Sequence, residues 1–321
     1  MATRTEMVYG RSGSGKTTWW LRLAEEFFVR HGKRTRLYIG DGGAETVESS
    51  GFVDEGSVEM LQFNLRDNPI ETSQRVCEGW WPNTSDLKDP KAPLQPPKYA
   101  DLDGKFGLFV FEGLSVMADF MMGDKPGGLA EQASRGNKIG MDSPYVVVDG
   151  TTKFGGNPPT HFGFAQRRIL DCIERTRALP GWVYWTAHER KAEDNETGEK
   201  EFGPDIAGKA LTTKIGASFG NSIHLHPAAK KVKVKDKVTG KEVEHLEVEY
   251  RAYTRKHYDP EGNTFVRYFA NNRMPRGFEK DMPEYLAPPD PIAFYSILEE
   301  AKRKKLELLR GRDGQGNPIN N

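Results

Sequence analysis

The chain has 321 residues with 46 basic and 46 acidic side chains, so its formal net charge is zero. This balance excludes a globally basic coat for nucleic acid and leaves only local patches for such binding. Two cysteines, Cys77 and Cys172, are too few for a disulfide scaffold, and we expect both to be small buried residues. No apolar run approaches the ~18 residues that cross a bilayer, and no signal-peptide core opens the chain. We therefore expect a cytoplasmic protein with no membrane partner.

The first 190 residues predict alternating strands and helices. Strands that are apolar throughout are typical of a parallel sheet covered on both faces. The predicted fold is therefore α/β, with a mainly parallel sheet flanked by helices. The expected strands are Met7–Tyr9, Arg36–Gly40, Val58–Phe63, Leu108–Phe111 and Trp182–Thr186, and the expected helices are 17–30, 69–81 and Phe164–Leu179.

Two long segments interrupt this pattern and are expected to be insertions. Residues 82–104 carry several prolines, which argue against a regular element. Residues 113–160 are rich in glycine and methionine, with one strand-like patch at Tyr145–Val148. Loops of this length inside a domain are usually functional or mobile. Residues 189–207 are likewise expected to be a loop.

The pattern changes in the last third of the chain. Lys230–Tyr253 alternates apolar and charged residues around Thr239-Gly240, which predicts an antiparallel hairpin. Another strand is expected at Phe265–Phe269, and one helix over 291–310 before a disordered tail. That helix is basic, through Lys302, Arg303, Lys304, Lys305 and Arg310.

The segment Gly10–Thr17 reads GRSGSGKT and matches G-x-x-x-x-G-K-[ST], between a predicted strand and a predicted helix. Its glycines let several N–H groups face one anion at a helix N-terminus. Lys16 is expected to reach the β- and γ-phosphates of ATP, and Thr17 to hold Mg²⁺. The alternative is an ordinary glycine-rich turn. The predicted ATP-binding residues are Gly10, Ser12, Gly13, Ser14, Gly15, Lys16, Thr17 and Thr18.

A second metal ligand is expected at the end of another strand. Glu112 and Asp149 are the candidates, and we favour Glu112 because its strand precedes a helix-like segment. Asp149 is otherwise a turn residue before Gly150. Asp41 and Glu45 follow the second strand and can orient an attacking water, or they are a polar loop.

His188 follows the strand Trp182–Thr186 and is a candidate for contact with the γ-phosphate. The alternative is a strand-end histidine that faces solvent. The seven histidines show no HExxH or paired-cysteine spacing. The sequence therefore predicts no metal ligands beyond Thr17 and Glu112.

Several motifs occur in a familiar order: GRSGSGKT, GLFVFEGLS, WVYWTAHE, GPDIAGKAL and YFANNRMPRG. Through these motifs and their order, the chain resembles the compact RecA-like ATPases of bacteriophages, which are often described as AAA-family proteins. The resemblance covers roughly residues 5–280. The resemblance implies a RecA-like P-loop ATPase domain at 1–280, followed by a basic helix and tail at 281–321. It also implies rings or filaments with ATP at subunit interfaces.

The resemblance assigns roles to individual residues. Lys16 and Thr17 match the Walker A pair, Glu112 the Walker B acid and His188 the sensor position. Arg273 matches a basic residue that reaches a neighbour's γ-phosphate and so takes part in hydrolysis. This chain departs from the pattern at Asn271, where many relatives have lysine, and in using Glu rather than Asp at Walker B.

The expected function is ATP hydrolysis in phage recombination or replication, on single-stranded DNA and with a single-strand-binding protein as a further partner. Two alternatives stay open: an ATP-driven factor that assembles or remodels proteins, and a small-molecule kinase. The hairpin lysines are either a phosphate-binding track or a solvated edge strand. These lysines are Lys230, Lys231, Lys233, Lys235, Lys237 and Lys241.

Overall fold

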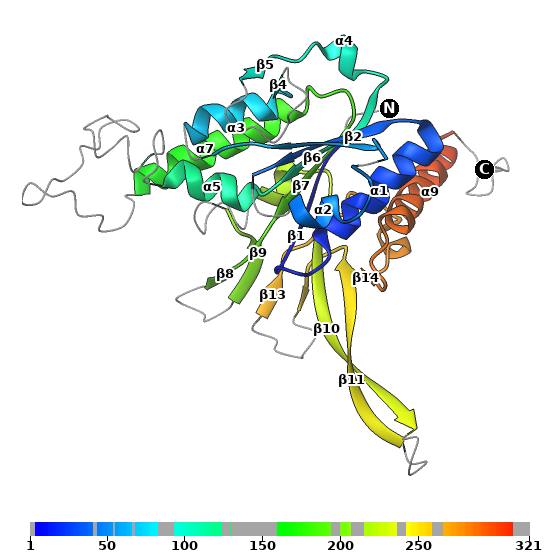
Figure 1. The fold of residues 1–321 in the computed structure, drawn as a ribbon. Helices are drawn as coiled ribbons and strands as arrows, with labels where there is room; N and C mark the ends of the chain where they lie inside the picture. The colour runs from blue at the N-terminus through cyan, green and yellow to red at the C-terminus, as the bar shows by residue number, and fades with distance from the viewer. Residues whose placement is uncertain are drawn as a thin grey trace, which may run out of the picture.

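The computed structural model describes residues 4–40, 44–53, 55–65, 68–82, 93–123, 129, 159–193, 200–206, 215–235, 242–258 and 266–310. In this part of the chain, eight strands form the central sheet in the order β14-β11-β10-β1-β7-β6-β2-β3 (Figure 1). Six of them are parallel neighbours: β1 (Arg4–Gly10), β2 (Arg34–Ile39), β3 (Val58–Gln62), β6 (Phe106–Glu112), β7 (Trp182–Ala187) and β10 (Ser222–Lys235). The predicted α/β class with a mostly parallel sheet is confirmed.

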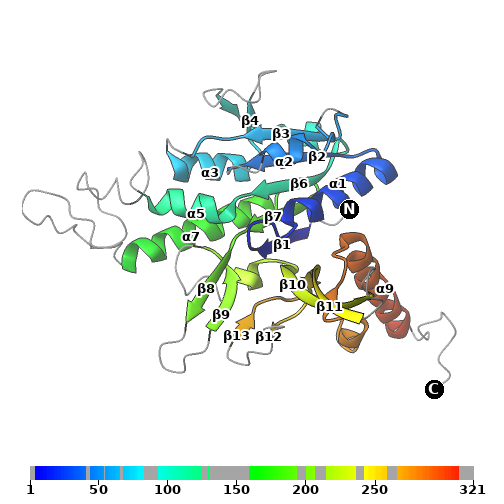
Figure 2. The same ribbon diagram turned by 60° about the horizontal axis from the view of Figure 1, so that its bottom comes forward.

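Helices cover both faces of this sheet (Figures 1 and 2). On one face α1 (Lys16–His31), α2 (Ala44–Glu48) and α9 (Pro291–Leu309) pack in one apolar cluster. On the other face α3 (Pro69–Cys77), α5 (Leu114–Met122) and α7 (Pro159–Thr176) pack in a second cluster. Neighbouring residues of β1 alternate between the clusters, with Val8 in the first and Met7 and Tyr9 in the second. Both faces are therefore buried, as the strand pattern predicts.

The antiparallel elements lie at one edge and below the body in Figure 1. Strand β10 continues past the sheet and pairs with β11 (Glu242–Tyr253) as a long projecting hairpin, and β11 also pairs with β14 (Tyr285–Leu286). A separate small sheet has the order β12-β13-β9-β8. Its strands are β8 (Glu189–Glu193), β9 (Lys200–Pro204), β12 (His257–Tyr258) and β13 (Val266–Tyr268). Short elements complete the fold: β4 (Trp81–Pro82), β5 (Leu94–Gln95), α4 (Tyr99–Leu102), η1 (Ile215–Ser218) and η2 (Glu279–Asp281).

Three local predictions differ from the structure. The helix expected over 69–81 ends at Cys77, because Gly79 turns the chain with φ of +87°. Residues 82–104, expected to be irregular, contain β5 and α4, whereas helix α5 lies where a helix-like segment was expected after Glu112. Residues 189–207, expected to be a loop, contain strands β8 and β9. The patch Tyr145–Val148 and the tail beyond residue 310 lie outside the described residues.

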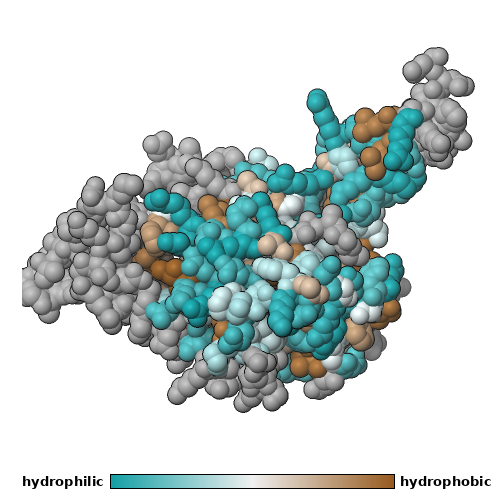
Figure 3. All heavy atoms as spheres, turned by 90° about the horizontal axis from the view of Figure 1, so that it is seen from above, coloured by the Kyte–Doolittle hydropathy of each residue, from teal (hydrophilic) through white to brown (hydrophobic). Residues whose placement is uncertain are grey.

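The outer surface is polar on the face seen in Figure 3, where small hydrophobic patches interrupt a hydrophilic cover. Among the described helices, none combines the length and the apolar character that a bilayer span requires. Both cysteines, Cys77 and Cys172, are buried free thiols in the second apolar cluster.

Candidate functional site

The loop Gly10–Thr17 joins the carboxyl end of β1 to the first turn of α1. Gly15 precedes the helix with φ of +93°, a left-handed conformation that glycine adopts without strain. The first N–H groups of a helix have no partners within it, and they carry its partial positive charge. All predicted ATP-binding residues lie on this loop or in this first turn: Gly10, Ser12, Gly13, Ser14, Gly15, Lys16, Thr17 and Thr18.

Lys16 folds back over the loop. Its Nζ donates hydrogen bonds to the carbonyl oxygen atoms of Gly10, at 3.0 Å, and Arg11, at 2.9 Å. Ser14 is buried beside it, and its hydroxyl oxygen has no hydrogen-bond partner among the described residues. A buried hydroxyl without a partner is costly. This oxygen faces the backbone of β1, where a Cβ atom at Gly10 would lie 2.6 Å from it.

Thr17 and Glu112, the two predicted metal ligands, are in direct contact. The Thr17 hydroxyl donates to Oε1 of Glu112 at 2.7 Å. Glu112 is the last residue of β6 and is only 5% exposed. The hydroxyl and carboxylate oxygens are hard donors of the kind that Mg²⁺ accepts, so this pair fits a magnesium ion.

His188 follows β7, the strand that lies between β1 and β6. Its main chain is held on both sides, because its N–H donates to the Ser115 hydroxyl at 2.8 Å and its carbonyl accepts from Asp205 at 2.6 Å. The carboxyl ends of β1, β6 and β7 therefore share one edge of the sheet. Ligands of open α/β sheets bind at such edges.

Of the three remaining candidate acids, the structure describes only Glu45. Asp41 and Asp149 lie outside the described residues, so both stay predictions. Glu45 is exposed on α2.

Arg273 lies away from the loop, at the amino end of β1. Its N–H groups donate to the carbonyl oxygens of Ala217, Phe219 and Gly220 at 3.1–3.4 Å, and Gly220 in turn bonds to Thr5. Thr5 and Gly10 are five residues apart on the strand, about 16 Å at ~3.3 Å per residue. Within one subunit, Arg273 therefore does not meet Lys16 or Glu112, and a role at a neighbour's nucleotide stays a prediction.

A cavity of about 710 Å³ opens beside the loop. Ser14, Gly15 and Thr18 form one wall, Val248 and Tyr250 of the hairpin form another, and Pro288 and Pro289 close the rim. Arg22 on α1 donates to the carbonyl of Pro289 at 3.4 Å. The sequence did not indicate this cavity, because its walls come from three distant parts of the chain.

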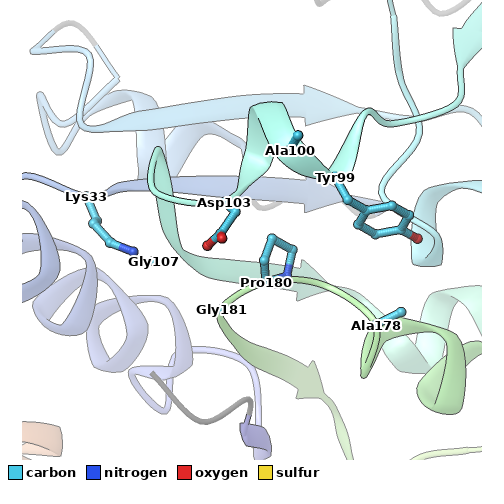
Figure 4. Close-up of a pocket in the computed structure, with 8 residues that line it drawn as sticks. All are labelled: Lys33, Tyr99, Ala100, Asp103, Gly107, Ala178, Pro180 and Gly181. Atoms are coloured by element: carbon cyan, nitrogen blue, oxygen red, sulfur yellow. The ribbon is translucent and has the colours of Figure 1, made fainter.

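A second hollow of about 500 Å³ lies at the opposite edge of the sheet (Figure 4). Gly107 and Gly181, at the amino ends of β6 and β7, form its floor, and Lys33 and Asp103 supply charged groups. It shares no residue with the loop site.

Glu189 connects the loop to a buried histidine. Its Oε1 accepts from Nε of Arg11 at 3.2 Å, and its Oε2 lies 2.7 Å from Nε2 of His224. Burial lowers the pKa of His224. Burial alone would raise the pKa of Glu189, but its hydrogen bonds with His224 and Arg11 bring it below its usual value. The spacing of the histidines in the sequence did not predict this contact between Glu189 and His224.

No protein-family model matches this chain, and no curated protein is significantly similar to it.

Proposed function

We propose that this chain is an ATP-binding and ATP-hydrolysing protein of the RecA-like P-loop class. The observation that carries the proposal is the 2.7 Å contact between Thr17, the residue after Lys16, and Glu112. This contact puts a hydroxyl and a carboxylate from two distant segments beside a helix N-terminus. Magnesium triphosphates are bound by that combination of groups.

Each group then has a defined task. The loop N–H groups and Lys16 bind the β- and γ-phosphates, and Thr17 and Glu112 hold Mg²⁺. When bound, the ion neutralises charge on the phosphate oxygens. Asp41 orients the attacking water, and His188 senses the γ-phosphate from the end of β7.

The cavity beside the loop accommodates the base and ribose. Its volume of about 710 Å³ lies within the ~300–1,000 Å³ usual for ligand pockets. Tyr250 offers an aromatic ring and Pro288 an apolar surface for the base, while Arg22 and Glu249 offer polar groups for the ribose. One ligand then spans the loop and the cavity.

Single-stranded DNA remains the proposed activator, on the strength of the motif resemblance, with phage recombination or replication as the setting. The hairpin gives this proposal little support, because three of its described lysines pair with glutamates of β11. The nitrogen–oxygen distances are 2.7 Å for Lys230–Glu249, 3.3 Å for Lys231–Glu244 and 3.9 Å for Lys233–Glu242. Such pairs reduce the charge available to a phosphate backbone.

The same hairpin favours a second candidate, an ATP-driven factor that acts on another protein. Leu246 and Val248 are 65% and 64% exposed, and they alternate along one face of β11. Contiguous exposed apolar residues often mark protein contacts. Stimulation of ATP hydrolysis by single-stranded DNA would favour the first candidate, and an unchanged rate the second.

The test of ATP binding compares two lysines at opposite edges of the sheet. Lys16→Ala removes the charge over the loop and should weaken Mg-ATP binding by ~2–4 kcal/mol in isothermal titration calorimetry. Lys33→Ala removes the charge in the second hollow and should leave the affinity unchanged. The reverse result would move the nucleotide to the hollow in Figure 4, and unchanged affinity in both would overturn the proposal.

A further inference from the structure

A cluster of three metal-ligating side chains lies behind the loop, outside the proposed nucleotide site. His224 and His226 are alternate residues of β10 and project from the same face of the strand. Glu189, the first residue of β8, approaches them from the small sheet. One ligand atom from each residue lies within 4.8 Å of the other two. The cluster is buried, with side-chain exposures of 0% for His224 and 3% for Glu189.

The hydrogen bonds around His224 indicate where protons are lacking. The Tyr258 carbonyl can only accept, so Nδ1 of His257, 3.0 Å away, carries a hydrogen. A neutral His257 then presents a lone pair at Nε2, and this atom accepts from Nδ1 of His224 at 3.1 Å. A neutral His224 then points its own Nε2 lone pair at the Glu189 carboxylate, 2.7 Å away, and only a protonated His224 donates a hydrogen bond to it. Two electron-rich atoms this close need a cation or a proton between them.

We propose that Glu189, His224 and His226 bind a divalent transition-metal ion of the zinc class. Imidazole nitrogen and carboxylate oxygen are donors that zinc accepts, whereas Mg²⁺ and Ca²⁺ prefer oxygen alone. His257 acts as the outer partner that orients His224, a role usual for a group bonded to the second nitrogen of a metal-binding histidine.

The geometry needs only small adjustments. Zinc bonds of ~2.0–2.2 Å place neighbouring donors of a tetrahedral site about 3.4 Å apart. The Glu189–His224 pair must widen from 2.7 Å, and the widest pair must close from 4.8 Å. Both changes require the side chains to move, and water can fill a fourth position.

The ion would connect three parts of the fold. Glu189 belongs to the small sheet and the two histidines belong to the main sheet, so one ion joins the sheets. An ion at Oε2 of Glu189 leaves Oε1 in contact with Arg11 of the loop. Metal binding therefore stabilises the position of the loop. The inference stands without ATP binding, because it uses none of the proposed phosphate or magnesium ligands.

The test uses the untagged full-length chain, stripped with a chelator and then titrated with Zn²⁺ and, separately, with Co²⁺. We expect about one ion per chain, a higher thermal unfolding midpoint with zinc, and the visible absorption of Co²⁺ bound by nitrogen and oxygen. His226→Gln and Glu189→Gln should each weaken zinc binding by at least about 100-fold, with folding checked by circular dichroism.

Two controls separate this site from others. His31→Gln removes a histidine at the exposed end of α1, and Thr17→Ala removes a proposed magnesium ligand. Both should keep one tightly bound zinc ion. If the parent chain binds no stoichiometric zinc, the Glu189–His224 contact holds a shared proton and the proposal is wrong. Equal zinc affinity in the parent chain and in folded His226→Gln would overturn it too.

Discussion

Glu6 is a carboxylic acid buried within β1, only 2% exposed. Burial raises its pKa to about 7, although a hydrogen bond with Asn221 and the charge of Arg4 oppose the shift. The folded pKa is thus above the unfolded value of about 4.5, and folding favours the protonated form. Protonated Glu6 therefore contributes to the free energy of unfolding in full below pH ~4.5, and this stabilisation is lost as the pH rises toward 7.

The substitution Glu6→Gln tests whether the buried charge of Glu6 destabilises the fold at high pH, because glutamine keeps the shape of the side chain without the charge. At pH 8 we expect the variant to have a higher free energy of unfolding than the parent, by up to ~3 kcal/mol, and at pH 4.5 by much less. Urea unfolding at the two pH values measures the difference. Glu25→Gln, an exposed acid on α1, should show no such pH dependence. A difference of equal size at both pH values would contradict the assignment.

At the scale of elements, five of the six parallel strands (β1, β2, β3, β6 and β7) could be predicted from their own apolar residues. Strands β8 and β9 read ERKAE and KEFGP, and they exist because they pair with each other and with β13. A strand formed by pairing leaves no local signal in the sequence. The start of β10, with its alternating His224 and His226, was missed for the same reason.

The candidate site likewise contains residues that the sequence could predict and residues that it could not. The Gly10–Thr17 loop is continuous in sequence, so its motif could be found directly. The choice of Glu112 was an inference about a strand end, and the structure places that residue beside Thr17. Glu189 and His224 meet only because β10 lies parallel to β1, a pairing that spacing along the chain does not reveal.

Gly10, where β1 meets the loop, depends on the close approach of β10. A Cβ atom there would lie 2.3 Å from the carbonyl oxygen of Leu225, a backbone atom that cannot turn aside. Gly10→Ala should therefore force β1 and β10 apart and lower the free energy of unfolding by about 1–3 kcal/mol. ATP affinity should fall with it, because the loop begins at this residue.

Gly163→Ala is the matched control for Gly10→Ala. Gly163 lies in α7 with open space around its Cβ position, so alanine should stabilise the helix by ~0.5–1 kcal/mol. Thermal unfolding of the two variants should shift the midpoint in opposite directions. An unchanged or higher midpoint for Gly10→Ala would show that the β1–β10 contact does not constrain residue 10.

For the whole molecule, the basic C-terminal helix is part of the same body as the loop. Phe294 and Leu298 of α9 are buried in the cluster that contains α1. Several of its cations are paired: Lys302 with Glu299, and Arg303 with Glu300 and Glu307. Exposed pairs of this kind add little stability, but they lower the charge that the helix offers to nucleic acid.

The rings or filaments that the motif resemblance implies lead to a prediction about Arg273, which lies at the sheet edge opposite the loop of its own subunit. An arginine delivered across an interface stabilises charge on the γ-phosphate and can raise the rate 10³–10⁵-fold. Arg273→Ala subunits keep their loop, and Lys16→Ala subunits keep their arginine. A mixture should then regain ATPase activity that neither variant has alone, in an assay run beside a sizing column.

The contacts of Arg273 define the competing result. Its guanidinium holds the turn at 217–220 through hydrogen bonds to carbonyl oxygens, and loss of such a bond typically destabilises a fold by ~0.5–1.5 kcal/mol. If that is its whole role, Arg273→Ala lowers the unfolding temperature but leaves the ATPase rate per folded chain unchanged. Asn271, bonded through its side chain to the N–H of Ser222, then shares this structural role instead of standing in for a missing catalytic lysine. An inactive mixture that still co-assembles would likewise exclude catalysis across the interface.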